Sequence, residues 1–200
     1  MTSSKIKLPD VTLVCLTNQK FPEHLEAMEK SSEQIEFGAR KIIYDMDCDS
    51  IEKWNEKIIK ELPNYVQTSH ALLIHSDGYV INPHFWSDSW LNYDYIGAVW
   101  PLPQDNYSYR DEEGNIVRVG NSVSLRSKKL MDLVATRPME YHYGNNNEDG
   151  QICCWNRKWL ESQGCKFAPF HEAMSFSKEH HLPEHDALGE NFKTFAFHSL

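Results

Sequence analysis

Hydrophobic and polar positions change in a regular order along the first 75 residues. Short, nearly unbroken apolar runs occupy residues 11–16, 41–44 and 71–74, and each run is typical of a strand buried in a sheet. Between these runs, apolar residues recur at helical spacing after Pro22 and again over residues 51–62. The order strand, helix, strand, helix, strand implies right-handed crossovers, so these segments predict a parallel sheet.

The second half of the chain has a more mixed pattern. Further strands are predicted at residues 95–100 and 119–125, and further helices at residues 128–135 and 151–162. Asp49 and Glu52 have the spacing of a capping box at the start of an earlier helix. We therefore expect one α/β domain over residues 10–200, with a mixed, mainly parallel sheet flanked by helices, after a flexible stretch at residues 1–9.

Composition and charge narrow the range of partners. The formal net charge of −9 argues against binding to a nucleic-acid backbone or to an anionic membrane, because both attract basic surfaces. We find no apolar run near the roughly 20 residues that a membrane helix needs. The five cysteines are an odd number, and Cys153 and Cys154 are adjacent, so a disulfide framework is not expected. These features predict a cytoplasmic protein with free thiols and no transmembrane segment.

A polar stretch follows directly after the third predicted strand. His75-Ser76-Asp77-Gly78 places an imidazole, a hydroxyl and a carboxylate where the apolar run 71–74 stops. In open α/β sheets, ligands bind at the carboxyl ends of the strands, so this stretch is a candidate binding site. A simple turn explains the same residues, because Asp-Gly is a common turn pair. The stretch alone leaves both interpretations open.

Two further stretches carry candidate chemistry. The first is Asn145-Asn146-Asn147-Glu148-Asp149-Gly150, which places two carboxylates at the predicted start of a helix. Carboxylates are favoured there by capping and by the helix dipole, so a purely structural role is about as plausible as a catalytic one. The second is Phe195-Ala196-Phe197-His198, in which aromatic residues precede a histidine.

A rival site is suggested by histidines near the C-terminus. A zinc-dependent hydrolase would need ligands such as these at a standard spacing, but their spacing matches no common zinc pattern. Solvated loop histidines are the better interpretation. The histidines concerned are His171, His180, His181 and His185.

The residues of six stretches, and the order of these stretches along the chain, resemble those of a bacterial family of uncharacterised glycosyltransferase-like domains with the glycosyltransferase A fold. The stretches are "LLIHSDGYVINPHFW", "YDYIGAVW", "VGNSVSLRSKKLMDLV", "NEDGQIC", "GCKFAPFHEAMSFSKE" and "FAFH". They span residues 71–198 in the family's order, whereas residues 1–70 match only in the alternation of strands and helices. Each stretch is short and of common residue types, and their combination carries the resemblance.

The resemblance implies a site for the donor, a nucleoside diphosphate sugar. An Asp-x-Asp element in such enzymes holds a divalent cation and the donor diphosphate; here Asp77 matches the second acid and His75 replaces the first. A late histidine, matched by His198, returns to the metal. The implied cation is Mn²⁺ or Mg²⁺, and imidazole suits Mn²⁺ better. The resemblance adds Gly78, Gly120 and Asn121 to Asp77 as expected donor-binding residues. Thr17 and Asn18, at the end of the first predicted strand and outside the stretches that carry the resemblance, complete the expected donor site.

The same resemblance implies a catalytic pair and an acceptor. Glu148-Asp149 is similar to the acidic pair beside the acceptor in many inverting sugar transferases, where one carboxylate takes the proton of the attacking hydroxyl; we favour Asp149. Apart from the resemblance, Trp86 lies near the presumed site and close to Asn82, and stacking on a sugar and packing in the core are equally good interpretations of its ring. Trp86 and Asn82 are the expected acceptor contacts. The predicted function is transfer of a sugar, of the hexosyltransferase type, to a glycan or another hydroxyl acceptor. The alternatives are a non-catalytic nucleotide-sugar- or carbohydrate-binding module and, third, the zinc-dependent hydrolase.

Overall fold

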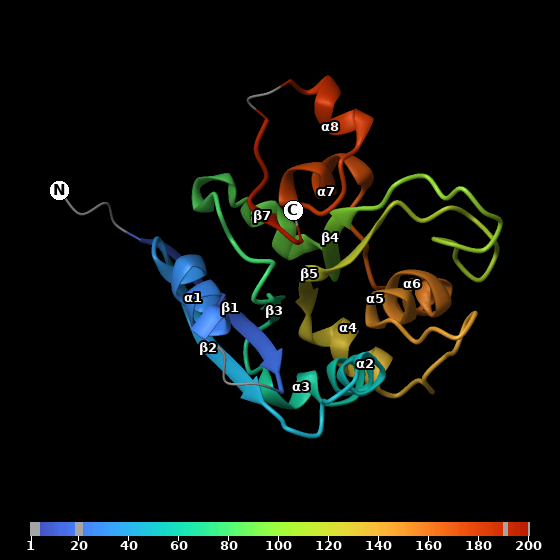
Figure 1. Cartoon of the computed structure of the whole chain (residues 1–200), viewed down its shortest axis with the longest axis horizontal. Coiled ribbons are helices and arrows are strands. Elements are labelled where there is room, and N and C mark those ends of the chain that lie inside the picture. The colour runs from blue at the N-terminus through green and yellow to red at the C-terminus, as the bar shows by residue number, and fades with distance from the viewer. Residues whose placement is uncertain (1–4, 19–21, 190–191, 200) are drawn as a thin grey trace.

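A five-stranded mixed sheet forms the centre of the molecule (Figure 1). The structure is a computed structural model that describes residues 5–18, 22–189 and 192–199. The strands are ordered β2-β1-β3-β5-β4. β1 pairs in parallel with β2 and β3, and β5 runs antiparallel to β3 and β4, so β5 alone opposes the other four strands of the sheet. The strands are β1 (Ile6–Thr17), β2 (Ile35–Tyr44), β3 (His70–Leu73), β4 (Tyr95–Val99) and β5 (Val119–Ser127). This mixed, mainly parallel sheet confirms the prediction from the apolar runs.

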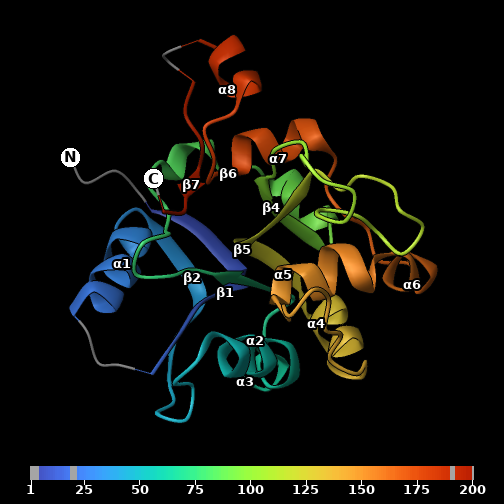
Figure 2. The ribbon, with the colours of Figure 1, turned by 45° about the vertical axis from the view of Figure 1, so that its right-hand side comes forward.

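Helices cover both faces of the sheet (Figure 2). The helices are α1 (Pro22–Ser32), α2 (Ile51–Lys60), α3 (Leu62–Tyr65), α4 (Lys128–Ala135), α5 (Glu148–Gly150), α6 (Arg157–Ser162), α7 (Phe170–Phe176) and α8 (Pro183–Ala187). A separate parallel pair of short strands, β6 (Ser177–Lys178) and β7 (Ala196–Phe197), lies near the C-terminus.

Alternate residues of β1 pack into two different cores, as the period of a strand requires. Leu13 belongs to the core that includes side chains of α1 and α7. Val14 belongs to the core that includes side chains of α2, α3 and α4. β3 and β4 are buried along their whole length, which explains their continuous apolar sequences. The sheet is therefore covered on both sides, and its strand ends remain the natural place for a ligand.

Two local predictions differ from the structure near the N-terminus and at α2. β1 begins at Ile6, inside the stretch 1–9 that we expected to be flexible; residues 1–4 lie outside the described residues. The N-cap of α2 is Ser50, whose hydroxyl accepts a hydrogen bond from the Lys53 N–H at 3.3 Å. Asp49, the expected cap, instead pairs with the Lys53 ammonium at 2.7 Å. The helix begins one residue later than the capping-box spacing assumes.

The helix predicted over residues 151–162 is divided into several parts. The short helix α5 leads into a π-helical turn at Gln151–Trp155, and α6 begins only at Arg157. The break lies at Asn156, whose side-chain amide donates to the Gln151 carbonyl oxygen at 2.9 Å. A side chain that takes over a backbone acceptor competes with regular helix formation. Single π turns are often found at functional sites.

Two further predictions from the sequence concern the cysteines and membrane-spanning helices. All five cysteines are free and buried. Within the described residues, no helix has both the length and the apolar character needed to cross a membrane.

Candidate functional site

A cavity of about 410 Å³ lies at the carboxyl ends of β1 and β3. Thr17 and Asn18 line it from the end of β1, His75 and Asp77 from the turn after β3, and His198 from the C-terminal segment. Its other lining residues are Leu16, His24, Ile51, Trp54 and Ser76. The structure thus brings together five residues that the sequence suggested for one site, because parallel strands present their carboxyl ends at the same edge of a sheet.

The turn after β3 is hydrogen-bonded to the C-terminal segment. The His75 N–H donates to the Gly78 carbonyl oxygen at 2.7 Å, which closes the turn. The Ser199 N–H donates to the Asp77 carbonyl oxygen at 2.9 Å, and the Ser199 hydroxyl donates to Asp77 Oδ2 at 2.8 Å. A Cβ atom at Gly78 would lie 2.6 Å from His198 Cδ2, so glycine is needed for this close approach. His198 therefore lies beside Asp77, 121 positions away in the sequence. Figure 1 shows the C-terminal end of the chain returning next to β7.

Asn121 lies next to His198, and neither Asn121 nor Gly120 is among the residues that line this cavity. The Asn121 side-chain amide nitrogen is 3.5 Å from His198 Nδ1. Its backbone has φ 88°, a left-handed conformation that asparagine tolerates better than most residues. Gly120 packs against the ring of Trp100, where a Cβ atom would lie only 2.0 Å from the ring. Asn121 is thus a neighbour of the histidine, and a role of either residue in donor binding stays a prediction.

The ionisable groups of the cavity have clearly different pKa values. Burial, reinforced by the nearby His198, lowers the pKa of His75 to about 3, so its imidazole is neutral. Burial alone would lower the pKa of His198, but the hydrogen bond to Glu179 and the charges of Glu179 and Asp77 raise it above its ordinary value. Burial alone would raise the pKa of Asp77, but Ser199 and His198 hold it below its usual range. His198 is thus the group that most readily carries a positive charge.

The expected metal ligands do not form a metal site. The His75 and His198 rings have centroids 5.0 Å apart, and His198 Nε2 is 3.7 Å from Asp77 Oδ1. His75 Nε2 is buried without a hydrogen-bond partner among the described residues, as a ligand atom would be. However, the described residues include no group of three His, Cys, Asp or Glu side chains that could hold a metal ion. The residues present do not fit the divalent cation, and the same finding applies to the histidines at 171–185.

The two adjacent carboxylates of α5 point into different surroundings. Glu148 is only 1% exposed and forms an ion pair with Arg126, which is also 1% exposed, at 3.1 Å. Asp149 instead lines a second cavity of about 500 Å³. Burial, reinforced by the charge of Glu148, raises the pKa of Asp149 to about 7. Glu148 is thus a structural residue of the core, whereas Asp149 has the pKa of a general base that works near neutral pH.

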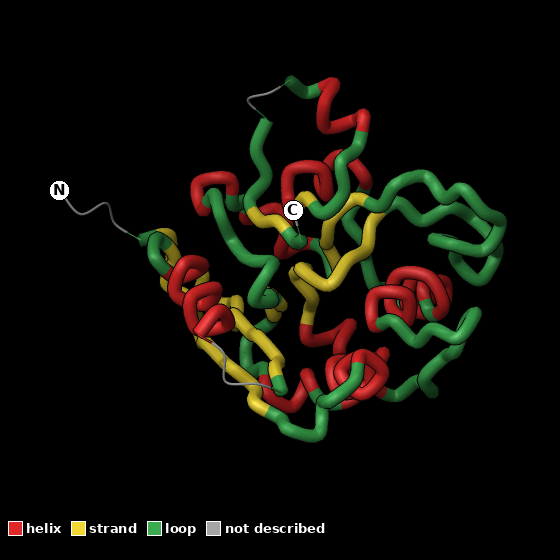
Figure 3. Tube along the Cα trace, in the orientation of Figure 1, coloured by secondary structure: helices red, strands yellow, loops and turns green. Residues whose placement is uncertain are grey.

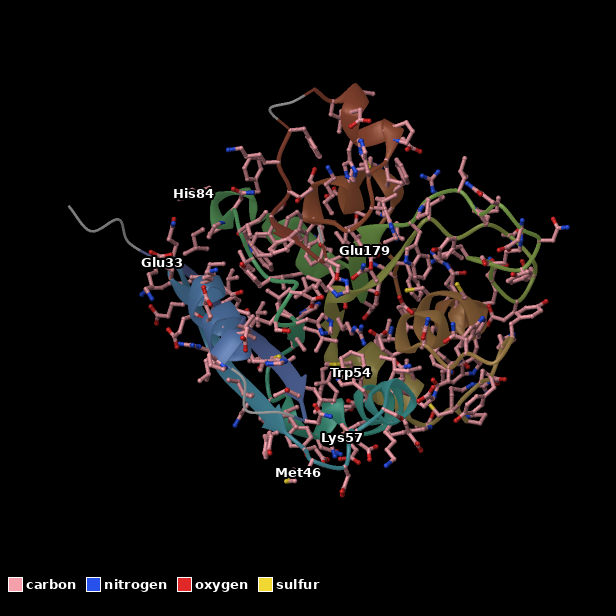
Figure 4. All side chains as sticks on the ribbon, in the orientation of Figure 1. Glu33, Met46, Trp54, Lys57, His84 and Glu179 are labelled. Atoms are coloured by element: carbon pink, nitrogen blue, oxygen red, sulfur yellow. The ribbon has the colours of Figure 1, made fainter. Side chains whose placement is uncertain are left out.

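Glu179 connects the two cavities. Its carboxylate lines the second cavity together with Asp149, and its Oε1 is 3.1 Å from Nδ1 of His198, which lines the first. Figure 4 shows Glu179 and Trp54 on opposite sides of the centre of the molecule. Sequence reasoning did not single out Glu179 for the transferase site. The one feature of the sequence that pointed to Glu179 was its position at the end of "GCKFAPFHEAMSFSKE", one of the six stretches that carry the family resemblance.

The two expected acceptor contacts lie elsewhere. The Trp86 indole N–H donates to Asp88 Oδ1 at 2.8 Å, and its ring packs against Trp90 and Phe195. The Asn82 amide donates to the Thr194 carbonyl oxygen at 2.7 Å, and Asn82 lines a third cavity of about 740 Å³. Neither residue is among those that line the cavities of Asp77 and Asp149. An acceptor role for Trp86 and Asn82 therefore stays a prediction that these contacts do not support.

Comparison with known proteins identifies the family. Residues 45–198 match the family described as "Protein of unknown function (DUF5672)". The chain belongs to the DUF5672 family. No curated protein sequence matches it. The 154 matched residues include both cavities' acidic groups, from Asp77 to Glu179.

Solved structures show which fold the family member adopts. A glycosyltransferase involved in the glycosylation of the major capsid of PBCV-1 is similar with a TM-score of 0.55 and 13% sequence identity. The match covers 94% of this chain and 92% of that one. A197 from STIV matches with a TM-score of 0.41 and 12% identity over 78% of this chain and 79% of that one, too weakly to carry an argument. The chain thus shares the fold of the PBCV-1 enzyme.

Proposed function

We propose that this chain is a glycosyltransferase that moves a sugar from a nucleoside diphosphate sugar to an acceptor hydroxyl, with inversion at the anomeric carbon. The observation that carries the proposal is the contact of Glu179 with His198, which joins a cavity at the strand ends to a cavity containing Asp149. A transferase must bring two substrates together at one point. The first cavity would hold the donor and the second would hold the acceptor.

The proposed reaction is a single displacement. The acceptor oxygen forms a bond to the anomeric carbon of the donor sugar, and the bond from that carbon to the diphosphate oxygen breaks. The electron pair of the broken bond leaves with the nucleoside diphosphate, and the proton of the acceptor hydroxyl passes to the carboxylate of Asp149. A carboxylate with a pKa of about 7 is well matched to this task, because a general base works best when its pKa lies near the working pH.

Negative charge on the departing diphosphate needs a counter-charge. The described residues that line the first cavity include no lysine or arginine. Burial lowers the pKa of His24 and of His75, which favours their neutral forms. His198, with its raised pKa, is therefore the side chain proposed to face the diphosphate, with Glu179 holding it in place. Asp77 would orient His198 and contact the donor through its free edge, since its side chain is 62% exposed.

We further propose that the fold is of the glycosyltransferase A type. The support is the strand order β2-β1-β3-β5-β4 with one antiparallel strand, together with the position of His75-Ser76-Asp77 at the end of the central strand β3. The likeness to the PBCV-1 enzyme over 94% of the chain is consistent with this assignment.

The test separates binding from catalysis. Calorimetry with UDP- and GDP-sugars, with and without Mn²⁺, measures donor binding, and release of nucleotide measures turnover. Asp149→Asn should lower the turnover rate by roughly 10²- to 10⁴-fold, because it removes the base but preserves the shape of the side chain. Donor affinity should be unchanged in Asp149→Asn and weakened in Asp77→Asn.

The matched control is Asp132→Asn, an exposed carboxylate on α4 that pairs with Lys128. This variant should retain both binding and turnover. Full turnover in Asp149→Asn would remove the base from the mechanism. Donor binding by the unaltered chain without any turnover would favour the nucleotide-sugar-binding module instead.

A further inference from the structure

The cavity of Asp149 has an unusual concentration of aromatic rings. Two long irregular segments, residues 100–118 between β4 and β5 and residues 136–147 between α4 and α5, lie on the same side of the molecule as α6 (Figure 3). Together with the turn before α6, they contribute three ring pairs to the cavity lining. The pairs are Trp100 with Tyr109, His142 with Trp155, and Tyr107 with Tyr143, with centroids 4.8, 4.5 and 4.3 Å apart.

One of these pairs is exposed rather than buried. Tyr107 is 53% exposed and Tyr143 is 78% exposed, although large aromatic side chains are usually more buried. Tyr143 also has φ 52°, a left-handed backbone conformation that is uncommon for a bulky residue. Tyr143 and Gly144 (φ 78°) are the central residues of a hairpin turn closed by two 2.9 Å backbone hydrogen bonds between His142 and Asn145, and such turns need positive φ at both positions. The exposed pair joins the two long segments at the cavity and offers an apolar surface to a ligand.

The charges of the cavity limit what the ligand can be. Its lining includes the carboxylates of Asp149 and Glu179, but no lysine or arginine among the described residues. Its two histidines are already engaged, because His142 stacks on Trp155 and His180 Nε2 pairs with Glu179 Oε2 at 3.2 Å. A phosphate or a carboxylate would therefore meet like charge without a lysine or arginine to offset it. Ser108, Asn145 and Asn147 add neutral hydrogen-bonding groups. The ligand should be neutral, with several hydroxyl groups and at least one apolar face.

A saccharide has this combination of properties. The C–H groups of a sugar ring form an apolar face that can pack on an aromatic ring, and its hydroxyl groups lie around the edge, where carboxylates and amides can bind them. Ligand sites typically combine aromatic lining with a few polar groups in volumes of roughly 300–1,000 Å³. The cavity of about 500 Å³ lies in this range.

We propose that the acceptor is a neutral saccharide, whose ring packs on the pair Tyr107–Tyr143 and presents a hydroxyl group to Asp149. This inference rests on the proposed function, because it assigns the second cavity to the acceptor. The three aromatic pairs, and not Trp86 or Asn82, are then the residues that select the acceptor. The cavity proposed for the donor has its own lining residues, so the binding of each substrate can be measured without the other.

The experiment measures saccharide binding without any donor. Saturation-transfer NMR with a panel of neutral disaccharides (maltose, cellobiose and lactose) would detect binding to the full chain, and a titration would give the dissociation constant. We expect at least one disaccharide to bind. Tyr143→Ala should weaken its binding by roughly tenfold, because an aromatic contact is lost. The matched control is Tyr141→Ala, an exposed tyrosine of the same segment that does not line the cavity.

The outcomes separate this inference from the proposed function. Binding that is weakened in Tyr143→Ala and retained in Tyr141→Ala supports the saccharide site. Absence of binding to all three disaccharides, or equal binding by Tyr143→Ala and the unaltered chain, overturns it. If donor hydrolysis persists in that case, the transferase proposal stands with a different acceptor. If disaccharides bind but no sugar nucleotide does, the saccharide site stands and the transferase proposal fails.

Discussion

The buried ion pair of Arg126 and Glu148 gives the sharpest prediction about stability. Both side chains are 1% exposed, and the Arg126 guanidinium is 3.1 Å from the Glu148 carboxylate. Burial alone would lower the pKa of Arg126, but the attraction of Glu148 raises it above its ordinary value. Glu148→Gln keeps the size of the side chain and removes its charge, so the buried Arg126 guanidinium would lose its ion pair with Glu148. Removing one partner of such a pair typically costs about 3–5 kcal/mol in the free energy of unfolding.

Urea denaturation followed by circular dichroism would measure this loss. With a slope of about 2 kcal/mol per M of urea, the midpoint should fall by about 1.5–2.5 M. The matched control is Glu26→Gln, which breaks the solvent-exposed pair with Lys30 and should shift the midpoint far less, because exposed ion pairs contribute little to stability. The double variant Arg126→Met with Glu148→Met should recover much of the loss, because a buried pair can often be replaced by apolar residues. A loss in Glu148→Gln no larger than that in Glu26→Gln would refute the reasoning.

Two further predictions concern pH and packing. The pKa of Asp149 is about 7 in the folded chain and about 4 when unfolded. Between these two pKa values, from about pH 4 to pH 7, the folded state binds more protons than the unfolded state, so the stability contributed by Asp149 is lost as the pH rises. Turnover needs the deprotonated carboxylate and therefore increases over the same range. Unfolding midpoints and turnover rates measured from pH 5 to 8 should change in opposite directions, and Asp149→Asn should flatten both trends. Gly78→Ala places a Cβ atom 2.6 Å from His198 Cδ2 and Val123 Cγ2, so it should cost about 1–3 kcal/mol and weaken donor binding; unchanged stability and binding would contradict the contact.

The strands of the sheet could be predicted because their residues are buried on both faces. β3 and β4 are entirely buried, so their apolar runs stand out in the sequence. β2 lies at the edge of the sheet and is longer than the predicted residues 41–44. Its first six residues were missed because they alternate between more and less buried positions and include Gly38 and Arg40. Edge strands carry polar residues that weaken the sequence signal. The first cavity could be predicted for a related reason, since strand ends fix the positions of Thr17 and Asp77.

The second cavity could not be predicted from the sequence. Its walls are irregular segments, whose conformation depends on contacts between distant residues rather than on local periodicity. Tyr107 and Tyr143 meet across two such segments, and nothing in the spacing of their neighbours indicates that pairing. Glu179 reaches His198 only because β6 and β7 pair in parallel. The sequence suggested Trp86 and Asn82 from their nearness to Asp77 along the chain, but residues close in sequence can point to different surfaces.

The different roles of Glu148 and Asp149 follow from the geometry of α5. Successive residues of a helix point about 100° apart, so two adjacent carboxylates cannot both face the second cavity. The Glu148 N–H donates to Asn55 Oδ1 at 3.3 Å, and the Asn55 amide donates to Asn146 Oδ1 at 3.1 Å, which ties the start of α5 to α2. With Glu148 held by Arg126, Asp149 has little freedom to turn away from the cavity. The buried ion pair therefore costs the protein desolvation energy but fixes the position of the proposed base. Glu148→Gln should then lower turnover as well as stability, with the loss of turnover arising from displacement of Asp149 and not from loss of a proton acceptor.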